Sequence, residues 1–316
     1  MTAPPSEGTP TLFRDSQRQA AFERDGYVIL DLLSEIEVDE LLRFAQRLDE
    51  KGVPRRGFRV SMDLADPDLV RAASAEIQRV AGAALSQHVH DHQSFVASFV
   101  VKDAHEASLV PPHQDWAFVD EAKFTSATVW TALVDMNLSN GALGVIPGSH
   151  RVLDYLRASP SPQCPSLIAP HLFALYPYLQ VKTLRAGQAI AWDHRLVHGS
   201  PPNRSGQPRI AAGIGIARRE APLLHHYLAP GGGAPRVETY SVDGEFFHRY
   251  GNAALGQLYD HGERPEAPLL TVAPHRPPVY STEALLARLR ENADISLDPA
   301  LAESAARDFA ALRRPS

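Results

Sequence analysis

The sequence predicts a mainly β fold, a sandwich or barrel, that is flanked along the chain by helices. Between about residues 94 and 220, short segments rich in branched and aromatic residues alternate with turn residues. On both sides of this region, apolar residues recur at the spacing of amphipathic helices. No linker divides residues 11–316, so we expect one domain, preceded by a polar, proline-rich and disordered segment at residues 1–10.

The N-terminal part is expected to form helices and one strand. Residues 15–25 have a helical pattern, and the apolar run GYVIL at 26–30 is typical of a strand. Ser34 precedes Glu37 by three residues, which is the spacing of a capping box at the start of a helix. A further helix is expected over residues 67 to about 85.

The strands that follow are expected to be short and separated by turns. Their segments are 94–101, 127–136, 179–184, 188–193 and 209–217. Turn residues lie at 147–149 and 200–208, and the Asn140-Gly141 pair after a strand predicts a β-hairpin. Helices at 281–291 and 298–312 are expected to end the chain.

Composition excludes several classes of function. The chain has 31 Lys and Arg against 37 Asp and Glu, a net charge of −6, which argues against nucleic acids and anionic membranes as main partners. It has no apolar stretch of about 18 residues, and its first residues lack the pattern of a signal peptide. The single cysteine, Cys164, forms no internal disulfide and is interpreted as an incidental thiol in a loop. We therefore expect a cytoplasmic protein without a membrane span.

The motif PPHQDW contains a possible metal-binding pair, His113 and Asp115. Residues i and i+2 of an extended segment point to the same face, so an imidazole and a carboxylate at this spacing can bind one ion. His198, just before a turn in WDHRLVHGS, is the candidate third ligand. Two histidines and one carboxylate leave three adjacent positions open, as a non-haem Fe(II) oxygenase requires. His-x-Asp alone is a weak signal, because such pairs are more often solvated or structural.

An arginine at a fixed distance strengthens this interpretation. Arg209 lies 11 residues after His198, beyond a turn-rich loop, at the start of the next predicted strand. If the chain reverses in that loop, Arg209 points into the same cavity, where its guanidinium can bind a carboxylate in a bidentate way. A surface ion pair is the alternative for Arg209. Arg204 is a competitor for the same role, but its place inside the turn indicates a solvated side chain.

The stretch from Phe22 to about Ile216 resembles the phytanoyl-CoA dioxygenase family of Fe(II)- and 2-oxoglutarate-dependent oxygenases. FERDGYVIL resembles the family's N-terminal signature, and PPHQDW resembles its first iron motif. The segment ATVWTALVDMNLSNGALGVIPGSHR is similar to its strand, turn and PGSH region. HGSPPNRSGQPR matches its second iron motif, with Ser two residues and Arg 11 residues after the histidine.

The resemblance implies a double-stranded β-helix, a jelly roll of the cupin type, with supporting helices. It implies that His113, Asp115 and His198 bind Fe(II), and that 2-oxoglutarate and O2 are co-substrates. Ser200 and Arg209 would hold the distal carboxylate of 2-oxoglutarate.

Two further residues are candidates for the co-substrate site. Trp130 is a candidate for the wall of the 2-oxoglutarate pocket, with a core aromatic as the alternative. Lys102 is a candidate contact to co-substrate or substrate, although the end of a strand favours a solvated lysine.

The expected reaction is hydroxylation of a small metabolite, with decarboxylation of 2-oxoglutarate to succinate and CO2. Related halogenases carry a small residue where this chain has Asp115, so halogenation is not expected. Desaturation, epimerisation and ring closure by the same kind of centre stay open. A non-catalytic ligand-binding jelly roll and a Zn(II)- or Mn(II)-dependent isomerase or hydrolase are the alternatives from other classes.

The other histidines are expected to have lesser roles. His194, four residues before His198, is the second-best candidate for the third ligand. His150 is expected to fix the PGSH turn, and His225 and His226 are expected to lie in a loop. The histidines of HVHDH alternate and are expected to form a polar surface near the rim of the site: His88, His90 and His92.

The substrate is expected to be a small polar or amphipathic molecule. Its pocket is expected to be shaped by the segments 55–63, 116–123 and 226–247. Trp116 and Phe118 are candidates for an apolar wall, with ordinary packing as the alternative. The candidate partners for an acidic substrate group are Arg56, Arg59 and Arg218. The lack of a net positive charge argues against the phosphates of a CoA thioester, with a local basic patch as the alternative that stays open.

Overall fold

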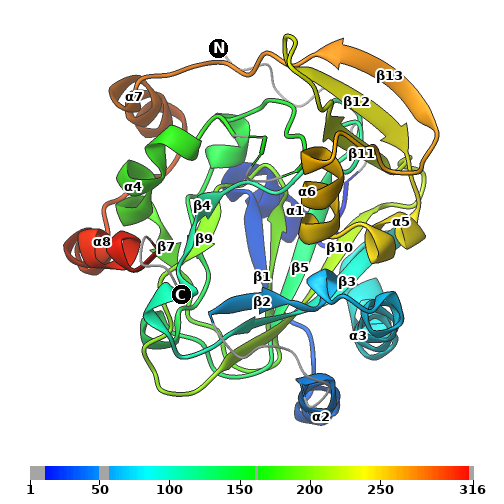
Figure 1. Ribbon diagram of the computed structural model, residues 1–316. Coiled ribbons are helices and arrows are strands. Elements are labelled where there is room, and N and C mark those ends of the chain that lie inside the picture. Colours follow the sequence, from blue (N-terminus) through cyan, green and yellow to red (C-terminus); the bar gives the residue numbers. More distant parts are fainter. Residues whose placement is uncertain (1–10, 50–56, 161–162, 165, 313–316) are drawn as a thin grey trace.

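The computed structural model describes residues 11–49, 57–160, 163–164 and 166–312 of the 316-residue chain. The segment 1–10, expected to be disordered, lies outside these residues. Two antiparallel sheets form the double-stranded β-helix that was predicted (Figure 1). The larger sheet has six strands in the order β1 (Tyr27–Asp31), β8 (Gln188–Asp193), β5 (Ser126–Ala132), β10 (Arg209–Arg218), β3 (His92–Lys102) and β2 (Phe58–Val60). The smaller has the order β4 (Val110–His113), β9 (His198–Ser200), β6 (Gly144–Val145) and β7 (Gln180–Val181).

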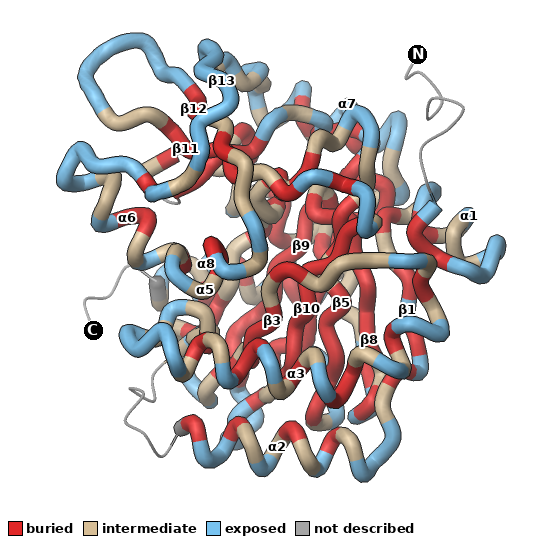
Figure 2. Tube along the Cα trace, turned by 90° about the vertical axis from the view of Figure 1, so that its right-hand side faces the viewer, coloured by how far each residue is buried: buried red, intermediate tan, exposed pale blue. Residues whose placement is uncertain are grey.

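Three helices near the N-terminus pack against the six-stranded sheet. They are α1 (Ser16–Asp25), α2 (Glu35–Asp49) and α3 (Pro67–His88). Their apolar faces share one core with the strands, and Figure 2 shows those strands as a buried band beside α2 and α3. The predicted capping box is present: the Ser34 backbone N–H donates to Glu37 Oε2 at 2.8 Å, and the Glu37 N–H donates to Ser34 Oγ at 3.4 Å. None of the described helices is both long and apolar enough to cross a bilayer.

A second core lies beside the four-stranded sheet. It is formed by α4 (Leu172–Leu175), α7 (Thr282–Asn292) and α8 (Pro299–Leu312), the last two close to the predicted C-terminal helices. The buried carboxylate of Asp308 accepts from Tyr176 at 2.7 Å and pairs with Arg204. This contact connects the last helix to the loop between His198 and Arg209.

The strands extend beyond the expected region of residues 94–220. β1, the strand predicted at 26–30, is an edge strand of the six-stranded sheet. A separate three-stranded sheet comes after the six-stranded sheet in the chain: β11 (Leu224–Leu228), β12 (Arg236–Ser241) and β13 (Leu269–Pro274). Two short helices, α5 (Gly244–Arg249) and α6 (Asn252–Asp260), lie between β12 and β13. The connections also contain 3₁₀ turns: η1 (Ser61–Asp63), η2 (Glu106–Ser108), η3 (Leu138–Asn140), η4 (Ser149–Arg151), η5 (Ala169–His171) and η6 (Tyr176–Tyr178).

The hairpin predicted at Asn140-Gly141 is wrong. Gly141 has a φ of 72° and ends the turn η3, in which Asn137 and Asn140 form a capping box. β5 before this turn pairs with β8 and β10, whereas β6 after it pairs with β7 and β9. The Asn-Gly pair therefore marks a left-handed turn at which the chain passes from one sheet to the other.

Candidate metal centre and anion site

The three predicted metal ligands meet in the smaller sheet. β4 and β9 are antiparallel, and their register places His113 opposite His198. Asp115 follows β4 by two residues. One ligand atom from each of the three residues lies within 4.8 Å of the others, and His198 Nε2 is 3.7 Å from Asp115 Oδ1. The cluster has the composition of the two-histidine, one-carboxylate site expected for Fe(II).

Hydrogen bonds orient each of these side chains. His113 Nδ1 is 2.9 Å from the carbonyl oxygen of Pro111, and His198 Nδ1 is 3.0 Å from that of Leu196. Because a carbonyl oxygen only accepts, each Nδ1 carries the proton and each Nε2 keeps a lone pair for a metal. The indole N–H of Trp192 donates to Asp115 Oδ2 at 2.9 Å and leaves Oδ1 on the side of the histidines.

The protonation states also fit a divalent cation. Burial lowers the pKa of His113 to about 4, so its imidazole is neutral at pH 7. Burial alone would raise the pKa of Asp115, but His198, His194, His113 and the Trp192 N–H together bring it below its ordinary value. A carboxylate and neutral imidazoles are the donor forms that bind metal ions.

Two buried cationic side chains lie at the end of the neighbouring strands. Lys102 on β3 and Arg209 on β10 are opposite each other in the sheet, with exposed fractions of 0% and 1%. Lys102 Nζ donates to Ser200 Oγ at 2.5 Å, to the Ser200 carbonyl at 3.2 Å and to the Pro201 carbonyl at 2.6 Å. The expectation of a solvated lysine is wrong, because the segment after β9 covers this end of β3.

Arg209 has spare capacity for hydrogen bonds. It donates from one terminal nitrogen to the Gly141 carbonyl at 2.8 Å, and its buried Nε has no partner. Its guanidinium lies 4.9 Å from the centre of the Trp130 ring, a cation–π contact that holds the fork in place. Trp130 also belongs to an apolar cluster, which is the core position considered as its alternative.

No carboxylate among the residues that the structure describes pairs with Lys102 or Arg209. Burial, and then the charge of Arg209, lower the pKa of Lys102 well below its ordinary value. Burial lowers the pKa of Arg209 to about 9. Since buried charge is costly without a counter-charge, this pair is suited to an anionic ligand, and Arg209 Nε is a free donor for it.

One cavity of about 650 Å³ joins the metal cluster to this anion site. His113, Asp115 and His198 line it, as do Trp130, Ser200 and Arg209. Trp116 and Phe118 also lie on its wall, where apolar residues were expected. A ligand bound at Arg209 can therefore extend to the metal cluster without leaving the cavity.

The other histidines do not join the cluster. Both ring nitrogens of His194 are used, by Ser126 Oγ at 2.7 Å and Thr128 Oγ1 at 2.9 Å. The loop expected at His225 and His226 is wrong, because both are buried in β11.

The remaining histidines have structural places. His150 Nε2 is 3.1 Å from the Glu23 carbonyl and so connects the PGSH turn to α1. The segment HVHDH spans the end of α3 and the start of β3, so its three histidines do not share one extended face. His88, His90 and His92 are absent from the wall of the cavity as far as its described residues define it.

The competing arginines are paired elsewhere. Arg204, expected to be solvated, bridges Glu106 at 2.7 Å and the buried Asp308 at 2.5 Å. Arg218 pairs with Glu220 at 3.0 Å. Arg59 pairs with Asp103 at 3.2 Å, and Arg56 lies outside the described residues.

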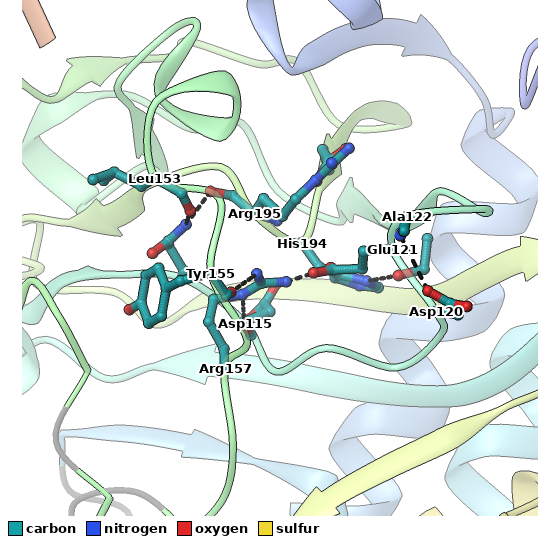
Figure 3. Close-up of polar contacts among 12 residues, drawn as sticks. Asp115, Asp120, Glu121, Ala122, Leu153, Tyr155, Arg157, His194 and Arg195 are labelled. Carbon is teal, nitrogen blue, oxygen red and sulfur yellow. Dashed lines mark hydrogen bonds and ion pairs between the residues drawn. The ribbon is translucent and has the colours of Figure 1, made fainter. Parts of the chain in front are cut away.

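Sequence reasoning missed a buried ion pair next to the metal cluster. Figure 3 shows the Arg157 guanidinium between the loop of Asp115 and the carboxylate of Glu121. Arg157 donates to the Asp115 carbonyl at 2.7 Å and to the Tyr155 carbonyl at 2.9 Å. No motif signals this contact, because its partners are 36 and 42 residues away in the chain.

Replacing this pair is expected to weaken metal binding. In an Arg157→Met/Glu121→Gln variant, the second change avoids a buried unpaired carboxylate, and the loop of Asp115 loses its anchor. We expect Fe(II) affinity to fall about tenfold, as for other residues that orient metal ligands. Competition with a chelator under anaerobic conditions measures this effect, with Arg79→Met on the surface of α3 as the control. An unchanged affinity would show that Arg157 does not position Asp115.

Two facing antiparallel sheets with a His-Asp-His cluster between them define a jelly-roll protein with a candidate non-haem metal centre. The sequence model of the phytanoyl-CoA dioxygenase family matches residues 22–211, and the chain belongs to this family. A protein of Arabidopsis thaliana described as phytanoyl-CoA dioxygenase is 28% identical over 132 residues. The match covers 39% of this chain and 43% of that relative, less than half the relative's length.

Two solved structures are similar to this chain. The epimerase SnoN, in complex with Fe3+, alpha ketoglutarate and nogalamycin RO, is 23% identical, with a TM-score of 0.50 and coverage of 81% of this chain and 95% of that one. HygX from Streptomyces hygroscopicus, with nickel and 2-oxoglutarate bound, is 16% identical, with a TM-score of 0.47 and coverage of 65% and 88%. The likeness to SnoN shows the fold.

Proposed function

We propose that this protein is an Fe(II)- and 2-oxoglutarate-dependent oxygenase that hydroxylates a small molecule. The observation that carries the proposal is the pairing of two sites in one cavity. The His113–Asp115–His198 cluster offers three converging ligand atoms, and Arg209 and Ser200 on the same cavity offer a site for a carboxylate, with the buried Lys102 behind Ser200. A dicarboxylate with an adjacent keto group is the kind of molecule that occupies both.

The residues of the cluster would bind Fe(II) through the Nε2 atoms of the two histidines and Oδ1 of Asp115. Fe(II) together with 2-oxoglutarate and O2 supplies an oxidant for a C–H bond of the substrate, with succinate and CO2 as by-products. The charge of Asp115 and the Nε2 lone pairs of the histidines suit a dication, and the carboxylate occupies the position that halogenation would leave to chloride.

The other end of the cavity would bind the distal carboxylate of 2-oxoglutarate. Arg209 would donate through its free Nε, next to the ring of Trp130. Because Ser200 Oγ already accepts from Lys102, its own proton is free to donate to the carboxylate. Lys102 uses its three donors on Ser200 and Pro201, so it would act by orienting Ser200 and by its charge.

The buried anion site separates this proposal from the alternatives. A Zn(II)- or Mn(II)-dependent hydrolase or isomerase gains nothing from a lysine and an arginine placed at this distance from the metal. A non-catalytic jelly roll does not require three metal-binding side chains whose ligand atoms converge. Desaturation, epimerisation or ring closure use the same residues and differ in how the substrate is held.

An anaerobic titration of the apoprotein with Fe(II) and 2-oxoglutarate tests the proposal. Chelation of iron by the keto acid is expected to give a weak visible charge-transfer absorbance that needs both components and no substrate. Glutarate, which lacks the keto group, is the control and is expected to give no such absorbance. If Fe(II) binds and 2-oxoglutarate produces no absorbance, the oxygenase proposal is wrong.

A further inference from the structure

Two glycines lie on the inner face of the six-stranded sheet. Gly213 and Gly215 on β10 line the cavity, as does Arg209 on the same strand. The register places Gly213 between Ser98 on β3 and Trp130 on β5, and both of these residues also line the cavity. A glycine inside a strand weakens the sheet and often marks a close approach of a ligand. Either packing or ligand binding must therefore explain why glycine occupies these two positions.

Packing accounts for Gly215. A Cβ atom at this position would lie 2.8 Å from Val96 Cγ1 and 2.9 Å from Phe95 Cε2, closer than real side chains approach. Phe95 is fully buried and packs against Phe118 and Phe247, so it has no space to withdraw. An alanine at 215 would overpack this cluster.

Packing does not account for Gly213. A Cβ atom there would lie 3.5 Å from Trp130 Cδ1, 3.7 Å from Thr128 Cγ2 and 3.9 Å from the Ser98 carbonyl, which are ordinary contacts. Its φ is outside the left-handed region, so the backbone does not require glycine either. A side chain at 213 would fit the sheet and would take up space in the cavity.

Aromatic residues stand around this part of the cavity. Trp116 and Phe118 are 6.2 Å apart between ring centres, and Phe118 and Phe247 are 5.5 Å apart. All three line the cavity, together with Trp130 and Trp192. Flat aromatic and aliphatic surfaces of this kind bind apolar ligands.

Apart from Asp115 and Arg209, which are assigned to Fe(II) and 2-oxoglutarate, the charged groups of this wall have protein partners. Arg157 donates to two carbonyls and pairs with Glu121, and Arg59 pairs with Asp103. Asp63 accepts from the backbone N–H of Asn252 at 2.8 Å. A charged substrate group placed here would compete with these contacts, whereas an uncharged one would not.

We propose that the cavity accepts an uncharged, flat and mainly apolar substrate, and that Gly213 sets the depth to which it enters beside the metal cluster. This inference rests on the proposed function and adds the class of substrate to it. It differs from the expectation of a polar or amphipathic substrate that composition suggested.

The test uses two fluorescent probes that share one skeleton. N-phenyl-1-naphthylamine is uncharged, and 1-anilinonaphthalene-8-sulfonate adds one sulfonate to the same rings. With the protein holding Fe(II) and 2-oxoglutarate under anaerobic conditions, we expect the uncharged probe to bind about tenfold more tightly than the sulfonate. Gly213→Leu is expected to weaken binding of the uncharged probe about tenfold, and Gly213→Ala less. Gly82→Leu on α3, where a side chain meets nothing within 4 Å, is the control.

Each outcome decides the inference. Equal or tighter binding of the sulfonate overturns the uncharged class. Unchanged binding to Gly213→Leu, or to Gly213→Ala if the leucine variant does not fold, overturns the role of Gly213. Loss of the Fe(II)–2-oxoglutarate absorbance in the Gly213 variants alone would place position 213 in the co-substrate site and also overturn it. Absence of that absorbance in the unmodified protein would instead refute the proposed function. The role of Gly213 can then still be tested by comparing binding of the uncharged probe to the unmodified apoprotein and to Gly213→Leu.

Discussion

An Asp115→Ala variant is expected to lose Fe(II), with an affinity lower by more than about 100-fold, because it removes a metal ligand rather than a residue that supports one. The two imidazoles that remain carry no negative charge, so they do not compensate the charge of a dication in a protein-lined cavity. His113→Ala is expected to have the same effect, because the remaining histidine and carboxylate come from two separate segments. The measurement is iron per chain after anaerobic loading and desalting, in chloride-free buffer so that chloride does not occupy the freed position.

The matched control is His194→Gln. His194 lines the same cavity but has both ring nitrogens bound to Ser126 and Thr128, so iron retention is expected to persist. If Asp115→Ala retains iron like the unmodified protein, the proposed ligand set is wrong. If His194→Gln loses iron as completely as Asp115→Ala, the third ligand has to be reassigned.

An Arg209→Met variant is expected to need about 100-fold more 2-oxoglutarate to form the visible Fe(II) chelate. The change removes a buried, charge-assisted contact to a carboxylate, which contributes about 2–4 kcal/mol. Fe(II) binding by itself is expected to be unchanged, because Arg209 does not contact the metal cluster. The titration of the absorbance with 2-oxoglutarate at saturating Fe(II) measures the effect.

The stability of the same variant provides an independent check. Burial lowers the pKa of Arg209 to about 9, so below that pH the apoprotein holds a charge that burial disfavours. The apo form of Arg209→Met is therefore expected to be at least as stable as the unmodified protein, and a lost affinity cannot then be ascribed to unfolding. Arg218→Met, at the other end of β10, is the control for 2-oxoglutarate. An unchanged requirement in Arg209→Met would show that another group holds the distal carboxylate.

Much of the local structure could be predicted from the sequence. The strand at 188–193 has the predicted bounds, and the capping box of Ser34 and Glu37 opens α2. These features depend on residues a few positions apart, whose geometry the backbone dictates. The hairpin at Asn140-Gly141 failed because a left-handed turn does not specify which strand pairs with which.

His225, His226 and Lys102 also show that features set by distant segments could not be predicted from the sequence. His225 and His226 lie in a strand whose sequence lacks a strong alternation of polar and apolar residues. The other strands of its sheet come later in the chain. Lys102 ends a strand and was expected in solvent, yet a segment almost 100 residues further along covers it. Its environment is non-local, and a charged residue at a strand end carries no sign of it.

The sequence by itself determined which residues of the candidate site lie at a fixed spacing along the chain: His113 and Asp115 at alternate positions, and Arg209 11 residues beyond His198. Only the tertiary structure decided what surrounds them. The antiparallel register places His113 opposite His198 and Lys102 beside Arg209, the fold brings Arg157 to the loop of Asp115, and Gly213 faces the cavity. The reason is physical: spacing along one strand follows from backbone geometry, whereas contacts between distant segments depend on how two sheets pair and pack.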